Sequence, residues 1–181
     1  MRKIIEYTLV SLDGVFEDPA RRGFMEYRDD AYLRDGLGLL LACDGMLMGR
    51  TVYEGNAKIW PQRAGAHPWA DRLNAIHKYV FSSKLERAEW ANSTIIRGDV
   101  PTELARLKQQ DGGNLLIWGH GLLAQTVLKH QLLDVLDLSI HPVIAGTGGL
   151  WFREGQSARM KLVATKMFSS GIVKLTYEPQ Y

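Results

Sequence analysis

One stretch, Asp44-Gly-Met-Leu-Met-Gly-Arg-Thr-Val-Tyr-Glu54, is a short apolar run that breaks at Gly49 and Arg50 and then continues in a helical pattern. A buried strand that ends at a glycine lets the next helix begin with free backbone N–H groups and the positive end of its dipole. Arg50 adds a forked cation at the same point. The stretch therefore predicts a strand end that binds an anion such as a phosphate.

Two later segments repeat this order of strand, small polar turn and helix start. They are Tyr79-Val-Phe-Ser-Ser-Lys84 and Leu115-Leu-Ile-Trp-Gly-His-Gly-Leu122. Three such strand ends in one small domain indicate a large ligand with several phosphates, such as a dinucleotide.

The composition indicates one folded domain over residues 1–181, with 46% hydrophobic and 23% charged residues. A net charge of +2 is too small to indicate a nucleic-acid or anionic-membrane partner without a clustered basic face. The single Cys43 cannot form an intramolecular disulfide, and no residues have the spacing of metal ligands. We therefore expect a cytoplasmic protein without a metal site.

No segment has the pattern of a membrane span. Glu6 and Asp13 interrupt the apolar N-terminal segment, which we interpret as the first strand. The apolar run Leu37–Cys43 is far shorter than the roughly 20 residues that cross a bilayer.

Hydrophobic periodicity predicts alternating strands and helices over the first two thirds of the chain. The predicted strands are Ile4–Leu12, Met46–Met48, Tyr79–Phe81, Ser93–Arg97 and Leu115–Trp118. The predicted helices are about 24–43, Arg50–Ile59, a segment opened by Gly98–Pro101 and ended by Gly112, and about 121–131. Two prolines and Gly65 predict an irregular loop from Trp60 to Trp69.

From Val135 the pattern changes to strands without helices between them. These are 136–140, Val143–Ile144, Lys161–Met167 and Ile172–Tyr177, and Ser169-Ser170-Gly171 is a hairpin signal between the last two. The whole pattern predicts an α/β fold with a mostly parallel twisted sheet, helices on both faces and a C-terminal antiparallel hairpin at one edge. Ligands of such sheets bind beyond the carboxyl ends of the strands.

Candidate motifs fall at those ends and in a particular order. They are Asp13-Gly14, Gly49-Arg50-Thr51-x-Tyr53-Glu54, Trp60-Pro61, Ser82-Ser83-Lys84, Gly119-x-Gly121-x-Leu123 and Pro142-Val143-Ile144-x-Gly146-x-Gly148. Each is common alone, but their order and spacing, over nearly the whole chain, resemble the dihydrofolate-reductase-like superfamily. More narrowly, they resemble the branch related to the reductase domain of bacterial riboflavin biosynthesis.

This resemblance implies NADPH as the cofactor and self-association as a homodimer. Gly49, Arg50 and Thr51 would hold cofactor phosphates at a helix start. Ser82, Ser83 and Lys84 would flank the adenosine 2′-phosphate and favour NADPH over NADH. The turn Gly119, His120, Gly121 and Leu122 would pass close to the pyrophosphate and the nicotinamide.

Several of these residues also have ordinary structural interpretations. Arg50 could be a surface cation, and Thr51 with Glu54 could form a helix-start pair. Ser82-Ser83 is often a plain turn. For His120 we weigh contact with the cofactor, proton donation and capping of the following helix, and we favour the first or the last.

Asp13 is the candidate catalytic and substrate-facing carboxylate, because it follows the first strand at the same edge. A turn-forming role before Gly14 is the alternative. Trp60 could stack on a flat substrate ring, or it could pack in the core.

The leading functional hypothesis is an NADPH-dependent oxidoreductase that transfers a hydride to a small nitrogen heterocycle, either pterin- or folate-like or a riboflavin-precursor pyrimidine. The alternative is a relative of the same fold that binds nucleotide or pterin without turnover. A flavin-binding oxidoreductase is a third hypothesis, which a colourless purified protein would argue against.

Overall fold

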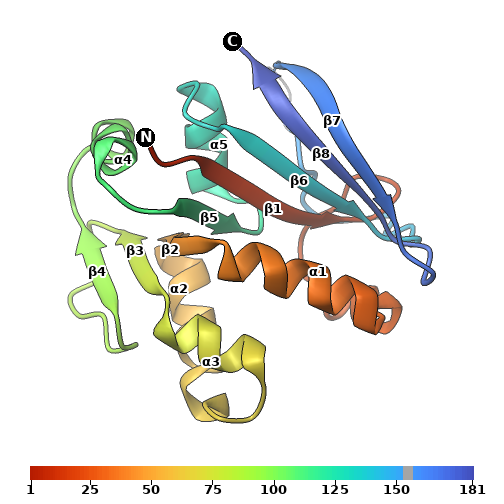
Figure 1. Ribbon diagram of the computed structural model, residues 1–181, viewed down its shortest axis with the longest axis horizontal. Helices are drawn as coiled ribbons and strands as arrows, with labels where there is room; N and C mark the ends of the chain where they lie inside the picture. Colours follow the sequence, from red (N-terminus) through yellow and green to blue (C-terminus); the bar gives the residue numbers. More distant parts are fainter. Residues whose placement is uncertain (153–156) are drawn as a thin grey trace.

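The computed structural model describes residues 1–152 and 157–181, in which eight strands form one sheet (Figure 1). The strand order is β4-β3-β2-β5-β1-β6-β8-β7. The strands are β1 (Ile4–Val10), β2 (Cys43–Gly49), β3 (His77–Phe81), β4 (Ser93–Ile96), β5 (Asn114–Trp118), β6 (Val135–Ile140), β7 (Arg159–Met167) and β8 (Val173–Gln180). Strands β1 to β6 pair in parallel, and β8 pairs antiparallel with β6 and β7. The predicted sheet is therefore confirmed.

Helices cover both faces of the sheet (Figure 1). They are α1 (Asp30–Leu41), α2 (Arg50–Ala57) and α3 (Pro68–Ala75) on one face, and α4 (Val100–Gln109) and α5 (Leu122–Lys129) on the other, with short 3-10 helices η1 (Phe24–Tyr27) and η2 (Pro61–Arg63). Strand β1 alternates between the two cores, because Ile5 packs with the first group of helices and Ile4 with the second.

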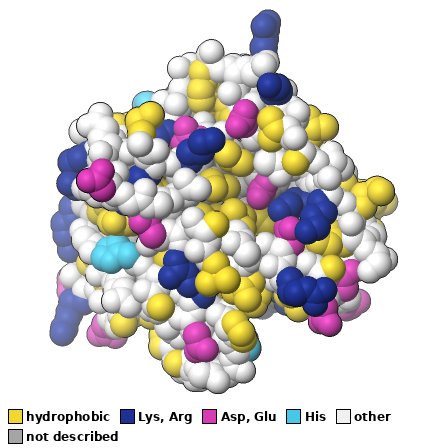
Figure 2. Space-filling view, viewed as in Figure 1, with side chains coloured by type: hydrophobic (Ala, Val, Ile, Leu, Met, Phe, Trp, Pro, Cys, Tyr) yellow, Lys and Arg dark blue, Asp and Glu magenta, His cyan; other side chains and the backbone are white. Residues whose placement is uncertain are grey.

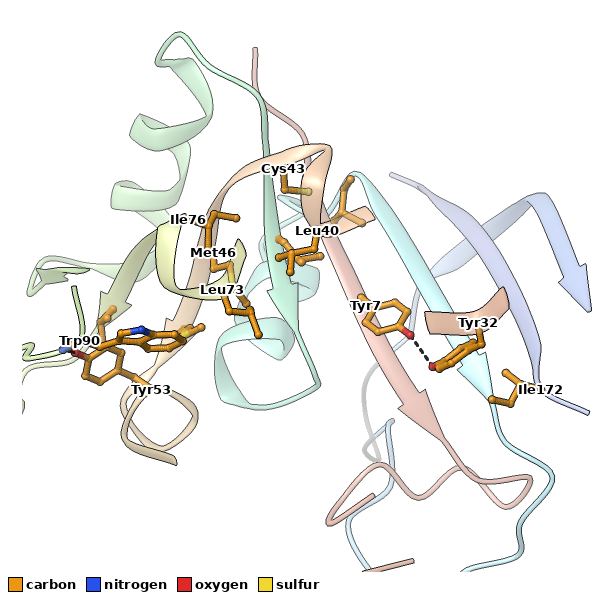
Figure 3. Close-up of a cluster of buried hydrophobic side chains, with 14 of the residues drawn as sticks. Tyr7, Tyr32, Leu40, Cys43, Met46, Tyr53, Leu73, Ile76, Trp90 and Ile172 are labelled. Atoms are coloured by element: carbon orange, nitrogen blue, oxygen red, sulfur yellow. Dashed lines mark hydrogen bonds between the residues drawn. The ribbon is translucent and has the colours of Figure 1, made fainter. Parts of the chain in front are cut away.

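The core under α1, α2 and α3 contains polar aromatic groups whose hydrogen bonds are satisfied (Figure 3). The Tyr7 hydroxyl donates to the Tyr32 hydroxyl at 2.6 Å, and the backbone N–H of Trp90 donates to the Tyr53 hydroxyl at 2.8 Å. A buried hydroxyl without a partner would be costly, so these pairs fix how α1 and α2 sit on the sheet.

Two predicted boundaries are wrong near the N-terminus. Strand β1 ends at Val10 rather than Leu12, and the helix predicted over about 24–43 is divided into η1 and α1. The division falls at Asp29, whose carboxylate accepts the Tyr32 N–H at 2.8 Å and caps α1. An aspartate N-cap sets a helix start that the hydrophobic period alone does not show.

The predicted irregular loop from Trp60 to Trp69 is also wrong at its end, because α3 begins at Pro68. Proline is favoured in the first turn of a helix, where its missing N–H is not needed. The predicted strand Val143–Ile144 is absent, and these residues lie in a loop that accepts the Leu12 N–H at the Val143 carbonyl.

The C-terminal hairpin turns where the sequence predicts it, and α1 is attached to it. The Gly171 N–H donates to the Phe168 carbonyl at 3.0 Å in the turn. Asp35 in α1 forms ion pairs with Lys166 and Lys174, and Asp29 accepts the hydrogen bond of the Ser169 hydroxyl.

Strand β7 lies at one edge of the sheet, and its last residue, Met167, is 80% exposed. The expected homodimer stays a prediction.

Within the described ranges, no helix is both long and apolar enough to cross a membrane. On the face shown in Figure 2, basic and acidic side chains are interspersed among apolar ones.

His141, directly after β6, is fully buried between aromatic rings. Its ring stacks on Phe24 at 4.7 Å and meets the edge of Tyr32 at 5.7 Å, and its Nδ1 lies 3.2 Å from the Ser139 carbonyl oxygen. Burial lowers the pKa of His141 to about 4. The unfolded chain therefore binds a proton at a higher pH than the folded one does.

We predict that acid weakens the fold through His141. Above pH ~6.5 both states are neutral at this residue, and between pH ~6.5 and ~4 only the unfolded state gains the proton, so the free energy of unfolding falls by up to about 3 kcal/mol. Urea denaturation across this range should show a smaller fall for His141→Phe than for the wild type. The exposed His130→Gln is the matched control, and parallel curves for the wild type and His141→Phe would contradict the prediction.

Candidate functional site

Three of the predicted motifs lie side by side along the carboxyl edge of the sheet. Strand β2 pairs with both β3 and β5, Gly49 is opposite Phe81, and Leu47 is opposite Ile117. Neighbouring strands lie about 4.8 Å apart, so the three strand ends span roughly 10 Å. Ser82–Lys84, Gly49–Thr51 and Gly119–Leu122 therefore follow adjacent strands.

At the centre of this edge, α2 begins without a side-chain cap. Gly49 is the N-cap residue, and a methyl group built on it would meet no atom within 4 Å. Arg50 is half-exposed and pairs with Glu54 at 3.0 Å. The suggested Thr51–Glu54 helix-start pair is wrong, because Gly49 is the N-cap and no side chain caps α2. The exposed Thr51 lies in the first turn. Uncapped N–H groups therefore remain open at this helix start, and the half-exposed Arg50 side chain begins there and is paired with Glu54.

The turn after β5 also leads into a helix start that no side chain caps. Gly119 has a φ of 87°, a region that favours glycine, and Gly121 is the N-cap of α5 without a side-chain cap. A methyl group on either glycine would meet nothing within 4 Å, and the next residue, Leu122, is 73% exposed. A second helix start is thus open to a ligand.

At the third strand end, the Ser82 hydroxyl organises a turn by accepting the N–H groups of Lys84 at 3.1 Å and Leu85 at 2.9 Å. Ser83 and Lys84 are exposed. Arg97, which follows β4, donates to the carbonyls of Ser83 at 3.3 Å and Leu85 at 2.7 Å. Sequence reasoning missed Arg97, although its position after a strand at the same edge was a usable signal.

Arg97 also lines a hollow of about 270 Å³ beside this turn, between β4 and α4. Tyr79, Ile96, Gly98 and Arg106 are among its other lining residues. Arg97 thus contacts both the Ser82–Lys84 turn and a partly apolar hollow that also contains Arg106.

A cleft of about 350 Å³ opens beside the turn that follows β5. Its lining residues come from β1, the following loop, α2 and the end of β5: Leu9, Phe16, Glu17, Asp18, Pro19, Asn56, Trp118, Gly119 and His120. Apolar and aromatic surface with a few polar groups is typical of a site for a small flat molecule. Two of these lining residues, Gly119 and His120, directly precede Gly121, the open start of α5.

Trp60 supports this cleft without lining it. Its indole N–H donates to Asn56 Oδ1 at 2.7 Å, and its ring lies 6.3 Å from that of Trp118. Trp69 packs on the same Trp118 ring at 5.4 Å. The geometry favours the packing interpretation of Trp60, because it fixes two residues that do line the cleft.

Asp13 connects two loops in this structure. Its carboxylate accepts the Ser11 hydroxyl at 2.6 Å and the N–H groups of Ala145 at 2.9 Å and Gly146 at 2.7 Å. The hydrogen bond from Ser11, followed by those from Ala145 and Gly146, lowers the pKa of Asp13 to about 2. An ionised carboxylate with these donors favours the turn-forming interpretation over proton transfer, and its catalytic role stays a prediction.

His120 does not cap α5, because Gly121 holds that position. Its Nδ1 lies 2.7 Å from Glu6 Oε1, and both side chains are 1% exposed. The Thr8 hydroxyl donates to the same oxygen at 2.8 Å. Glu6 lies in the middle of β1, where the sequence analysis assigned it no functional role.

The comparisons with known proteins agree with this geometry. The family model of the RibD C-terminal domain matches residues 2–174. The chain belongs to the RibD C-terminal domain family. It is 28% identical to the uncharacterized protein YyaP of Bacillus subtilis, with 97% of this chain and 94% of YyaP covered.

Solved structures share the fold of this RibD C-terminal domain. A putative riboflavin biosynthesis protein from Shewanella sp. PV-4 superposes with a TM-score of 0.73 at 20% identity, with both chains fully covered. A Thermotoga maritima deaminase/5-amino-6-(5-phosphoribosylamino)uracil reductase gives 0.68 at 17% identity, covering 99% of this chain and 57% of that one. Dihydrofolate reductase from Enterococcus faecalis, complexed with NADP(H), gives 0.63 at 18%, covering 99% and 97%. The predicted dihydrofolate-reductase-like fold is confirmed.

Alanine substitutions at Gly119 and Gly121 separate the cost of backbone strain from that of filling open space, because both sites have room for a methyl group but only Gly119 has a positive φ. Gly119→Ala should lower the free energy of unfolding by about 1–2 kcal/mol, because alanine is strained at a positive φ. Gly121→Ala, with a φ of −175°, should change it by less than about 1 kcal/mol. Urea denaturation of both variants measures the difference, and equal losses would show that the positive φ of Gly119 is not required.

Proposed function

We propose that the protein is an NADPH-dependent reductase of a small, flat nitrogen heterocycle of the pterin or pyrimidine kind. Family membership supports an oxidoreductase of the pyrimidine- and pterin-reductase kind. The observation that carries the proposal is that Gly119 and His120, which line the aromatic cleft, directly precede Gly121, the uncapped start of α5. A dinucleotide held along the sheet edge would thereby place its reactive ring beside a bound heterocycle.

The residues of the sheet edge fit NADPH. Gly49, Arg50 and Thr51 would hold a cofactor phosphate, since the helix start has no side-chain cap and Arg50 could turn from Glu54 to a phosphate. Gly119 and Gly121 leave the space that a methyl group would occupy, so the pyrophosphate can approach the backbone. Two structural neighbours support the same kind of cofactor and substrate. The Enterococcus faecalis dihydrofolate reductase is complexed with NADP(H), and the Thermotoga maritima protein is a 5-amino-6-(5-phosphoribosylamino)uracil reductase.

The 2′-phosphate would lie against the turn after β3. Lys84 is an exposed ammonium, and Arg97 holds the backbone of the same turn through Ser83 and Leu85. The extra phosphate of NADPH would gain an ion pair there that NADH lacks.

The cleft would hold the substrate between Trp118, Phe16 and Leu9, with Asn56 at one side. Bound NADPH supplies the hydride, so this chain needs to align the two rings and exclude water rather than provide a nucleophile. Trp60 and Trp69 keep Trp118 in place for that alignment.

A relative that binds without turnover is the second candidate. It is favoured because Asp13, the candidate catalytic carboxylate, accepts three hydrogen bonds and has a lowered pKa, which leaves it no proton to donate. Oxidation of NADPH with any member of a panel of pterins, folates and flavin precursors would exclude this candidate.

We predict that NADPH binds more tightly than NADH and that Arg50→Ala weakens NADPH at least several-fold. A charge-assisted hydrogen bond contributes roughly 1.5–3 kcal/mol, of which the existing pair with Glu54 offsets a part. The five tryptophans report binding by fluorescence.

Lys129→Ala is the matched control, because Lys129 is an exposed cation in the last turn of α5, at the far end from the site. Equal affinity for NADPH and NADH would contradict the 2′-phosphate assignment. Unchanged NADPH affinity in Arg50→Ala would contradict the role of Arg50.

A further inference from the structure

A carboxylate and an imidazole are buried together beneath the turn that follows β5. Glu6 Oε1 and His120 Nδ1 are 2.7 Å apart, with each side chain 1% exposed. Because a carboxylate only accepts hydrogen bonds, Nδ1 carries the hydrogen, and the Thr8 hydroxyl completes the contacts to Oε1. The other ring nitrogen, Nε2, is buried without a protein partner among the described residues.

Stability alone does not explain this pair. Removing two polar groups from water is costly, and buried pairs of this kind can often be replaced by apolar residues without loss of stability. On the same face of β1, Ile4 and Val10 are apolar core residues, and the buried Thr8 between Glu6 and Val10 uses its hydroxyl on Glu6 itself. A glutamate at position 6 therefore requires another reason.

The backbone around His120 supplies that reason. His120 is flanked by Gly119, in the left-handed region, and Gly121, in an extended conformation. Two glycines restrict the chain little, so contacts with neighbouring elements must hold the turn. The Gly119 N–H donates to the Tyr7 carbonyl at 2.8 Å, and the His120 side chain, held by Glu6, adds a second attachment to the central strand β1.

The anchored turn contributes to both parts of the site. His120 and Gly119 line the cleft, and Gly121 begins α5. Phe16, which forms another wall of the cleft, meets the His120 ring edge to face at 5.2 Å. The Trp151 ring lies 6.0 Å from that of His120.

We propose that Glu6 is a positioning residue for dinucleotide binding, acting through His120. The hydrogen bond to Nδ1 holds the Gly119–Gly121 turn in the shape that presents the first N–H groups of α5, and it supports Phe16 at the cleft. This inference rests on the proposed function. It assigns a role to a buried residue that touches neither cofactor nor substrate.

The test compares variants that separate geometry from stability. Glu6→Gln keeps an oxygen that can accept from Nδ1–H, so its NADPH dissociation constant should stay within about threefold of the wild type. The double variant Glu6→Met/His120→Phe replaces both polar groups with apolar ones of similar size, so it should keep its unfolding midpoint and bind NADPH at least about tenfold more weakly.

Asp134→Asn is the matched control. Asp134 forms a partly buried pair with Lys108 at 2.5 Å and accepts the Ile4 N–H, at the opposite edge of the sheet. This variant should lower stability and leave NADPH affinity unchanged. A double variant of Glu6 and His120 that folds and binds NADPH like the wild type would overturn the proposal.

Amide hydrogen exchange separates this inference from the proposed function. Exchange at residues 119–122 should be at least about tenfold faster in the double variant than in the wild type, at equal global stability. A wild type that fails to bind NADPH would overturn the proposed function, while the exchange comparison still decides the role of Glu6. Equal exchange in both proteins would overturn the anchoring role.

Discussion

In a parallel sheet every strand points its carboxyl end toward the same edge, and the pairing of β2 with both β3 and β5 brings three junctions together there. Because Gly49 and Gly121 start α2 and α5 without side-chain caps, backbone N–H groups remain available at that edge. The site therefore depends first on strand pairing and only then on particular side chains.

The second requirement is a wall that closes the cleft, and two distant loops build it. The carboxylates of Asp13 and Glu17 accept backbone N–H groups from Ala145, Gly146 and Gly149, and the Trp151 N–H donates to the Gly14 carbonyl. These contacts hold the segment after β1 against the segment after β6. Asp13, the candidate catalytic carboxylate, and Glu17 thus help to fix the position of Phe16 at the cleft.

The local patterns predicted most of the fold, because apolar period and glycine or serine at strand ends are properties of neighbouring residues. Two kinds of feature were missed. The start of α3 at Pro68 depends on a side-chain N-cap at His67, which the hydrophobic period does not show, and Val143 lies in a loop where its carbonyl accepts the N–H of the distant Leu12. The same holds for the site: its glycines and Arg50 could be found from spacing, whereas the Glu6–His120 contact joins residues 114 positions apart.

A crystal structure of the protein with NADPH tests the central claim most directly. The account predicts phosphates against the starts of α2 and α5, the 2′-phosphate between Lys84 and Arg97, and the nicotinamide ring at the cleft beside Trp118. NADPH bound away from this edge, or a nicotinamide ring held outside the cleft, would contradict it.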